Sequence, residues 1–147
     1  MIVLDTSIYV DALFIYDEQR SQVAKNLFRF IQEVGLRVIE PEILKIELIS
    51  QLVRRIDERE AFKIYDSIIS RIEVVNLEEL KELAFLIASK TGCRAIDSYF
   101  IATAKLTNSI LITNDKIMAI NAKKYGIEAY YLIEEFENVI KRLKELK

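Results

Sequence analysis

Four carboxylates occupy unusual positions in this sequence, which contains no histidine. Asp5 and Asp115 each follow a short apolar run. Asp97 opens a segment of helical character, and Glu47 lies inside an otherwise apolar helical segment. Carboxylates only a few ångströms apart raise one another's pKa unless a positive charge joins them. Hard divalent cations such as Mg²⁺ and Mn²⁺ prefer oxygen ligands. The four residues therefore predict a metal site and, with it, phosphate-ester chemistry.

The elements that must position these residues alternate along the chain. Short, continuously apolar runs are typical of strands covered on both faces, and they fall at residues 1–4, 36–39, 72–76, 109–113 and 127–132. Helical segments are expected at 6–13, 17–34, 41–56, 58–71, 77–90, 97–107, 115–125 and 133–146. This order predicts a three-layer α/β/α fold with a parallel central sheet of about five strands. No repeat or linker interrupts it, so residues 1–147 are expected to form a single domain.

Parallel strands bring their carboxyl ends to one edge of the sheet, and ligands bind there near the point where strand order reverses. Asp5 and Asp115 are placed at the ends of two such strands, and Asp97 begins the helix that leads into the strand before Asp115. We therefore expect the three carboxylates to converge, although they are far apart in sequence.

A simpler interpretation exists for each carboxylate. Asp5, Asp97 and Asp115 all precede helical segments, where an aspartate commonly serves as an N-cap. The N-cap interpretation weakens when the three aspartates are considered jointly, because residues that serve only as helix caps need not lie at one edge of the sheet. Glu47 lies at the margin of an apolar helix face, where it could instead reach solvent or pair with a lysine or arginine. Glu42, on the opening turn of the same helix, is better explained by the helix dipole.

Polar residues accompany the acids at two strand ends. Thr6 and Ser7 follow the first strand, and Thr113 and Asn114 end the fourth. They either form local turn hydrogen bonds or orient the carboxylates and metal-bound waters. Tyr99, beside Asp97, is a candidate for stacking on a substrate base. Four other aspartates are assigned to solvated helix faces: Asp11, Asp17, Asp57 and Asp66.

Composition excludes several classes of protein. The chain is 52% hydrophobic and 30% charged, which indicates a globular protein and not a disordered one. No window approaches 18 uninterrupted apolar residues, so no membrane span is expected. The N-terminus has no basic segment typical of a secretory signal, and the lone Cys93 can form neither an internal disulfide nor, without histidines, a zinc site. A cytoplasmic, reducing setting is expected.

Four motifs, at residues 4–7, 41–47, 94–104 and 111–116, resemble the PIN domain in their order and spacing. More narrowly, they are similar to the toxin subunit of VapBC-type toxin–antitoxin pairs. The resemblance covers nearly the whole chain and implies a metal-dependent ribonuclease, with RNA as substrate and a cognate antitoxin as partner.

Carried over position by position, Asp5, Glu47, Asp97 and Asp115 match the acidic quartet of that family. Ser7 and Thr113 match its usual polar companions. The expected reaction is hydrolysis of an RNA phosphodiester, in which one or two Mg²⁺ or Mn²⁺ ions activate a water and stabilise developing charge. The resemblance implies products with 5′-phosphate and 3′-hydroxyl ends. A net charge of −2 argues against binding of RNA by bulk positive charge, but does not exclude a nuclease with an acidic metal cluster.

Two alternatives remain open: an RNA-processing PIN nuclease without an antitoxin, and a non-catalytic receiver-like signalling or binding domain. A receiver domain places a phosphorylatable aspartate after its third strand, where this chain has Val75 and Asn76. A phosphatase with an aspartyl nucleophile needs a second aspartate two residues after the first, where this chain has Ser7.

The segment from Ile43 to Ile56 is apolar nearly all round, whereas a surface helix normally shows one apolar stripe. This pattern predicts a partner surface, and a closed two-fold homodimer is the commonest arrangement. The alternative is a helix at the centre of the monomer's own core.

Overall fold

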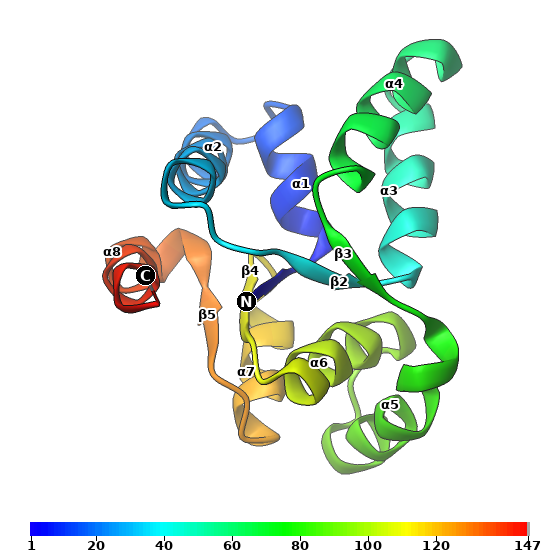
Figure 1. Ribbon diagram of the computed structural model, residues 1–147, viewed down its shortest axis with the longest axis vertical. Helices are drawn as coiled ribbons and strands as arrows, with labels where there is room; N and C mark the ends of the chain where they lie inside the picture. The colour runs from blue at the N-terminus through cyan, green and yellow to red at the C-terminus, as the bar shows by residue number, and fades with distance from the viewer. Residues whose placement is uncertain (147) are drawn as a thin grey trace.

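A computed structural model describes residues 1–146 (Figure 1). Strands and helices alternate along most of the chain. The strands are β1 (Ile2–Leu4), β2 (Ile39–Pro41), β3 (Glu73–Val75), β4 (Ile110–Thr113) and β5 (Ala129–Tyr131). The helices are α1 (Thr6–Leu13), α2 (Glu18–Val34), α3 (Ile43–Val53), α4 (Glu58–Ile69), α5 (Leu77–Thr91), α6 (Ala95–Thr107), α7 (Lys116–Lys124) and α8 (Leu132–Glu145).

The strands pair only in parallel and form two ladders. One ladder has the order β1-β4-β5, and the other joins β2 to β3. An isolated parallel bridge between Ile2 and Val38 connects the ladders, and the Ile2 amide donates to the Arg37 carbonyl at 3.0 Å. The combined order is therefore β3-β2-β1-β4-β5. The chain runs outward from β1 in both directions, so strand order reverses between β1 and β4.

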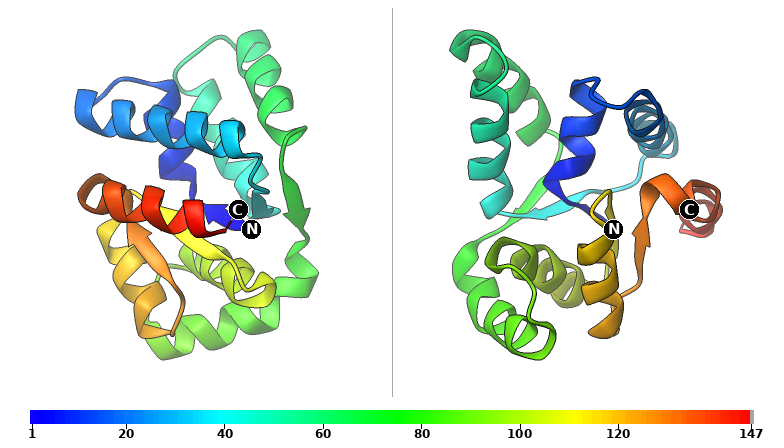
Figure 2. Two further views of the ribbon diagram at one scale, coloured as in Figure 1. Left: turned by 60° about the vertical axis from the view of Figure 1, so that its left-hand side comes forward. Right: turned by 180° about the vertical axis from the view of Figure 1, so that it is seen from behind.

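Helices cover both faces of these strands. In Figure 1, α1 to α4 lie on one side of the sheet, and α5, α6 and α7 lie on the other. Figure 2 shows α2 and α8 side by side and running in the same direction, whereas α3 and α4 form an antiparallel pair. The arrangement confirms the predicted three-layer α/β/α fold with a parallel sheet of about five strands.

The core lies between the strands and their covering helices. Each residue of β1 is fully buried, as are Leu111 and Ile112 of β4. Helices α6 and α3 cover this core from opposite sides (Figure 1), and each contributes a fully buried side chain, Phe100 and Leu48. Burial on both faces explains why the strands are continuously apolar. Within residues 1–146, every helix is either too short or too polar to cross a lipid bilayer.

The region around Pro41 differs from the sequence prediction. The second strand spans Ile39–Pro41 and not 36–39, and the helix predicted to begin at Pro41 begins at Ile43. Pro41 has no amide hydrogen, so it can end a strand as readily as it can open a helix. Glu42 is the N-cap of α3, and its Oε1 accepts from the Leu77 amide at 3.1 Å.

A buried carboxyl group joins the two ladders. Glu40 of β2 is fully buried between β2 and β1. Its Oε1 accepts from the Leu4 amide at 3.0 Å, and its Oε2 accepts from the Tyr9 hydroxyl at 2.5 Å. The side chain thus replaces a backbone carbonyl as the partner of Leu4. Burial raises the pKa of Glu40 well above its usual value, against the lowering effect of Tyr9 and the Leu4 amide.

Candidate functional site

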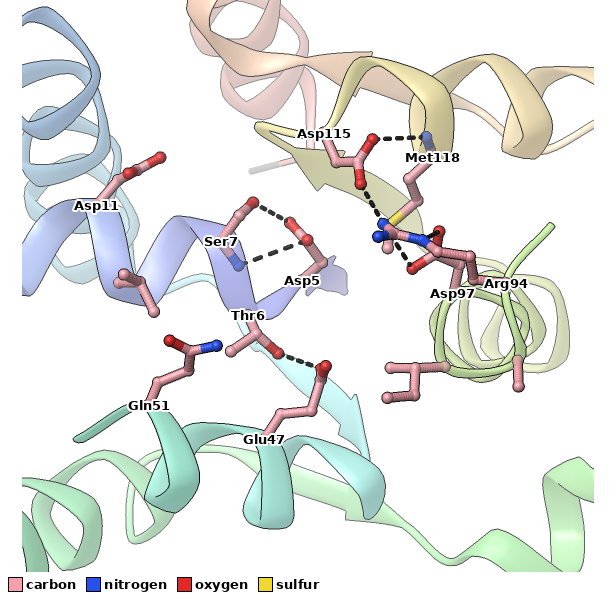
Figure 3. A pocket seen from close by; sticks show the side chains of 13 residues that line it. Asp5, Thr6, Ser7, Asp11, Glu47, Gln51, Arg94, Asp97, Asp115 and Met118 are labelled. Atoms are coloured by element: carbon pink, nitrogen blue, oxygen red, sulfur yellow. Dashed lines mark hydrogen bonds and ion pairs between the residues drawn. The ribbon is translucent and has the colours of Figure 1, made fainter. Parts of the chain in front are cut away.

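All four predicted carboxylates line one cavity of about 490 Å³ at the carboxyl edge of β1 and β4 (Figure 3). Four different elements supply them. Asp5 follows β1, Glu47 belongs to α3, Asp97 to α6, and Asp115 immediately precedes α7. The cavity lies where strand order reverses, the usual place for a ligand site in an open parallel sheet.

Asp5 lies at the end of β1 and is buried, with 6% of its surface exposed. It is the N-cap of α1, and its carboxylate accepts from the Ser7 amide at 3.4 Å and the Ser7 hydroxyl at 2.7 Å. Burial raises the pKa of Asp5 to about 7, although hydrogen bonds from Ser7 and Thr113 lower it, and the charge of Asp115 adds to the rise. Asp5 is therefore both a helix cap and a member of the acidic cavity.

Glu47 points from α3 toward the start of α1 (Figure 3). Its Oε1 accepts from the Thr6 hydroxyl at 2.5 Å. Burial raises the pKa of Glu47, and the hydrogen bond from Thr6 lowers it. The nearby charge of Asp97 raises this pKa further, whereas the charge of Arg94 lowers it. Within residues 1–146 the contact of this carboxylate is a hydroxyl and not a lysine or arginine, so the ion-pair interpretation does not describe it.

Asp97 is not an N-cap, because α6 begins two residues earlier with Arg94 as its cap. Its side chain is 6% exposed and forms an ion pair with Arg94, whose Nε lies 3.2 Å from Oδ2. Burial raises the pKa of Asp97, Arg94 lowers it through charge and hydrogen bonding, and Asp115 raises it further.

Asp115 uses its two oxygens differently. Oδ1 accepts from the amides of Ile117 and Met118, at 2.9 and 3.1 Å, which makes Asp115 the N-cap of α7. Oδ2 faces the cavity and lies 2.5 Å from Nη2 of Arg94. One guanidinium group thus bridges Asp97 and Asp115.

The polar companions hold the strand ends together. The Ser7 hydroxyl donates to Asp5 and accepts from the Asn114 amide at 3.1 Å, which ties the end of β4 to the start of α1. Thr113 accepts from the Asp115 amide at 2.9 Å. The Asn114 side chain instead contacts Asp11 at 2.8 Å and the Ile133 amide at 3.2 Å, so it joins α1 to α8 and does not touch the four carboxylates.

Sequence reasoning missed three polar residues that line the cavity: Asp11, Gln51 and Arg94. The sequence predicts a solvated helix face for Asp11, but this residue pairs with Arg20 at 3.3 Å beside the cavity. Its position four residues after Ser7, and that of Gln51 four residues after Glu47, place both on site-facing helix surfaces. Tyr99, considered for base stacking, packs against the core and does not line the cavity.

The donor set fits a hard divalent cation, because it offers carboxylate oxygens with hydroxyl groups beside them. In residues 1–146, no three acidic or cysteine side chains stand close enough to hold one ion together in this conformation. Arg94 lies between Asp97 and Asp115, where an ion shared by both would bind. The chemistry of the donors therefore fits a metal, and its binding requires side-chain movement.

Solved structures share this fold. PAE2754 from Pyrobaculum aerophilum aligns over 98% of this chain and 96% of its own, with 16% identity and a TM-score of 0.65. FitAcB from Neisseria gonorrhoeae aligns over 88% and 96%, with 20% identity and a TM-score of 0.64. A toxin–antitoxin complex from Klebsiella pneumoniae aligns over 78% and 87%, with 17% identity and a TM-score of 0.56. At these identities the likeness establishes the fold alone.

No match was found among curated proteins. The family model of the PIN domain, in contrast, matches residues 2–124, which include each of the four carboxylates. The match agrees with the resemblance seen in the sequence motifs, with the parallel sheet and with the fold of the solved structures. The chain belongs to the PIN domain family.

Proposed function

We propose that this protein is a Mg²⁺- or Mn²⁺-dependent endoribonuclease that hydrolyses RNA phosphodiesters. The observation that carries the proposal is the convergence of Asp5, Glu47, Asp97 and Asp115 on one cavity, from four elements far apart in sequence. So many carboxylates in one partly buried place repel one another and are stabilised by a cation. A receiver-like domain, considered from the sequence, does not fit a member of this family.

The four carboxylates would hold the metal. Thr6, Ser7 and Thr113 are the proposed supporting side chains, and Asn114 would support the site through its backbone amide, which donates to the Ser7 hydroxyl. A bound divalent cation supplies an activated water and stabilises charge on the phosphate and the leaving oxygen. Ser7 fixes the orientation of Asp5, and Thr6 fixes that of Glu47. The pKa of Asp5 is raised to about 7, so near neutral pH a cation competes with a proton for this ligand. Metal binding should therefore strengthen as pH rises.

A toxin–antitoxin role is the more specific form of this proposal. The Klebsiella structure of the same fold is a toxin–antitoxin complex, and FitAB has been solved bound to a DNA fragment. By analogy of fold, we propose a cognate antitoxin protein as partner of this chain. The alternative within the family is an RNA-processing nuclease without an antitoxin, and the genomic neighbourhood distinguishes the two. A small DNA-binding protein encoded beside this chain would support the toxin.

We also propose a homodimer. Three large apolar side chains on α3 and α4 are exposed, namely Ile46 (62%), Val53 (45%) and Phe62 (46%). Leu44, Leu48 and Leu52 on the same α3 are fully buried, so this helix serves the monomer core and also presents apolar surface to solvent. Light scattering at micromolar concentration measures the mass directly. A mass of one chain, 17.1 kDa, would contradict the homodimer.

The activity is tested with end-labelled single-stranded RNA, incubated with purified protein in Mg²⁺, in Mn²⁺, or with a chelator. We expect cleavage that depends on the cation and yields 5′-phosphate ends. Asp5→Asn should abolish it, because it keeps the shape of the residue and removes ligand charge. Asp66→Asn, an exposed aspartate of α4, is the matched control and should cleave normally. Cleavage that survives the chelator would reject the metal-dependent mechanism.

A further inference from the structure

Arg94 makes contacts that neither helix capping nor packing explains. It occupies the N-cap position of α6, yet its side chain makes no capping hydrogen bond. Its guanidinium reaches into the acidic cavity, where Nε and Nη2 lie 3.2 and 3.5 Å from the two oxygens of Asp97. Nη2 also donates to Asp115 at 2.5 Å. Figure 3 shows the group between these two carboxylates.

The carboxylates it contacts depend on it. Within residues 1–146, both oxygens of Asp97 find their hydrogen-bond partner in Arg94, and the cavity-facing oxygen of Asp115 does the same. Asp97 is nearly buried, so an unpaired charge there is costly. Arg94 itself is 71% exposed, so its side chain can withdraw into solvent without disturbing the core.

We propose that Arg94 is an internal counter-ion that competes with the divalent cation for Asp97 and Asp115, and thereby sets the cation concentration at which the site is filled. This inference rests on the proposed function. In the metal-free protein the guanidinium satisfies the two carboxylates and stabilises the fold. A cation that binds them displaces the guanidinium, and the free energy of the lost ion pairs is subtracted from the free energy of metal binding.

Arg94 is thus a positioning residue that acts on the carboxylates. Its removal has two opposite effects. The metal-free protein loses the only cation that contacts Asp97 and Asp115 among the described residues, so carboxylate repulsion lowers its melting temperature. The same change removes the competitor, so the affinity for a divalent cation rises. A residue that merely supported the fold would lower stability without strengthening metal binding.

The test measures Mn²⁺ binding by isothermal titration calorimetry without RNA, in the natural protein and in Arg94→Gln. Charge-assisted ion pairs of this kind predict a decrease in Kd of about five- to tenfold in the variant. Arg20→Gln is the matched control, since Arg20 pairs with Asp11 beside the same cavity but contacts none of the four carboxylates. Its Kd should stay within about twofold, because a charge farther away acts through screened solvent.

Thermal unfolding supplies a second measurement. We expect Arg94→Gln to melt lower than the natural protein without metal, and to gain more from added Mn²⁺. In RNA cleavage, the Mg²⁺ concentration for half-maximal rate should fall in the same variant. Binding of Mn²⁺ to Arg94→Gln that is equal to, or weaker than, binding to the natural protein would overturn the counter-ion role and leave the proposed nuclease intact. Failure of all three proteins to bind Mn²⁺ would reject both.

Discussion

Two buried carboxyl groups lie next to each other in this fold, but one is enclosed by hydrogen-bond donors of the protein and the other faces an acidic cavity. Glu40 sits in the seam between β1 and β2, and both of its oxygens accept from groups of the protein itself, the Leu4 amide and the Tyr9 hydroxyl. Asp5, one residue after Leu4, faces an open cavity that Glu47, Asp97 and Asp115 also line. Burial raises the pKa of both. A raised pKa therefore does not distinguish a structural acid from a candidate ligand, whereas the surroundings do.

The largest expected difference is in catalysis. Asp97→Asn should lower the rate of RNA cleavage at least about a thousandfold, since even residues that only orient metal ligands cost 10–100-fold when changed. Glu40→Gln keeps the volume and an acceptor in the seam, so its rate should stay within about tenfold. Initial rates at saturating Mg²⁺ measure both. Full activity of the Asp97 variant would remove the mechanism as stated.

The free energy of unfolding should fall more when Glu40 is changed than when Asp97 is changed, the reverse of the order expected for activity. Glu40→Ala leaves the Leu4 amide and the Tyr9 hydroxyl without partners in a buried seam, which should cost roughly 2–5 kcal/mol of unfolding free energy. Asp97→Asn removes charge from an acidic cavity and should change stability by less than about 1 kcal/mol. Urea unfolding of the metal-free proteins gives both values. Equal losses of unfolding free energy in the two variants would contradict the structural role assigned to Glu40 and the ligand role assigned to Asp97.

The pH dependence of stability separates the two groups further. The pKa of Asp5 is about 7 in the folded protein and 3.8 as its reference value, so between these pH values the folded state holds a proton that the unfolded state has lost. The stabilisation is complete below about pH 4 and is lost as pH rises through 7, by roughly 1–4 kcal/mol.

Glu40 contributes a decline of the same sign, because its pKa is also raised in the folded protein. The pKa values of Glu47 and Asp97 are raised as well. Mn²⁺ should reverse the part of the decline that comes from the cavity carboxylates, since the cation binds their ionised forms, and should leave the part from Glu40. Unfolding curves between pH 4 and 8, with and without Mn²⁺, measure the two parts. In Asp5→Asn the response of the decline to the metal should be smaller than in the natural protein, and an unchanged response would contradict the assignment to Asp5.

The smallest effect concerns the hydrogen bonds that hold Asp5 in place. Ser7→Ala removes a hydroxyl that donates to Asp5 and accepts from the Asn114 amide. It should cost about 1 kcal/mol of stability and weaken Mn²⁺ binding by about tenfold. Ser89→Ala, on exposed α5 surface with only a bond to its own helix, is the control and should leave Mn²⁺ binding unchanged. Equal Mn²⁺ affinities in both variants would show that metal binding by Asp5 does not depend on the hydrogen bond from Ser7.

Sequence reasoning placed Asp5 and Asp115 correctly at strand ends because parallel topology alone brings such ends together. Each proved to be a helix cap as well, so the two interpretations of an acidic strand end do not exclude each other. Glu40 was missed, since its role depends on the register of β2, which the sequence prediction placed too early. Arg94 was missed as a contact of the carboxylates because its role depends on the direction of a long side chain, which residue spacing does not determine.

The seam has a consequence for the shape of the cavity. Asp5 and Asp115 follow β1 and β4, two strands of the three-strand ladder. In contrast, β2, on the other ladder, leads directly into the helix that carries Glu47. The two ladders are joined by one backbone bridge and one carboxyl group, a narrower attachment than a full row of backbone bonds. The spacing between Glu47 and Asp5 therefore depends in part on this narrow attachment, since Glu40 accepts from the amide of Leu4, the residue directly before Asp5.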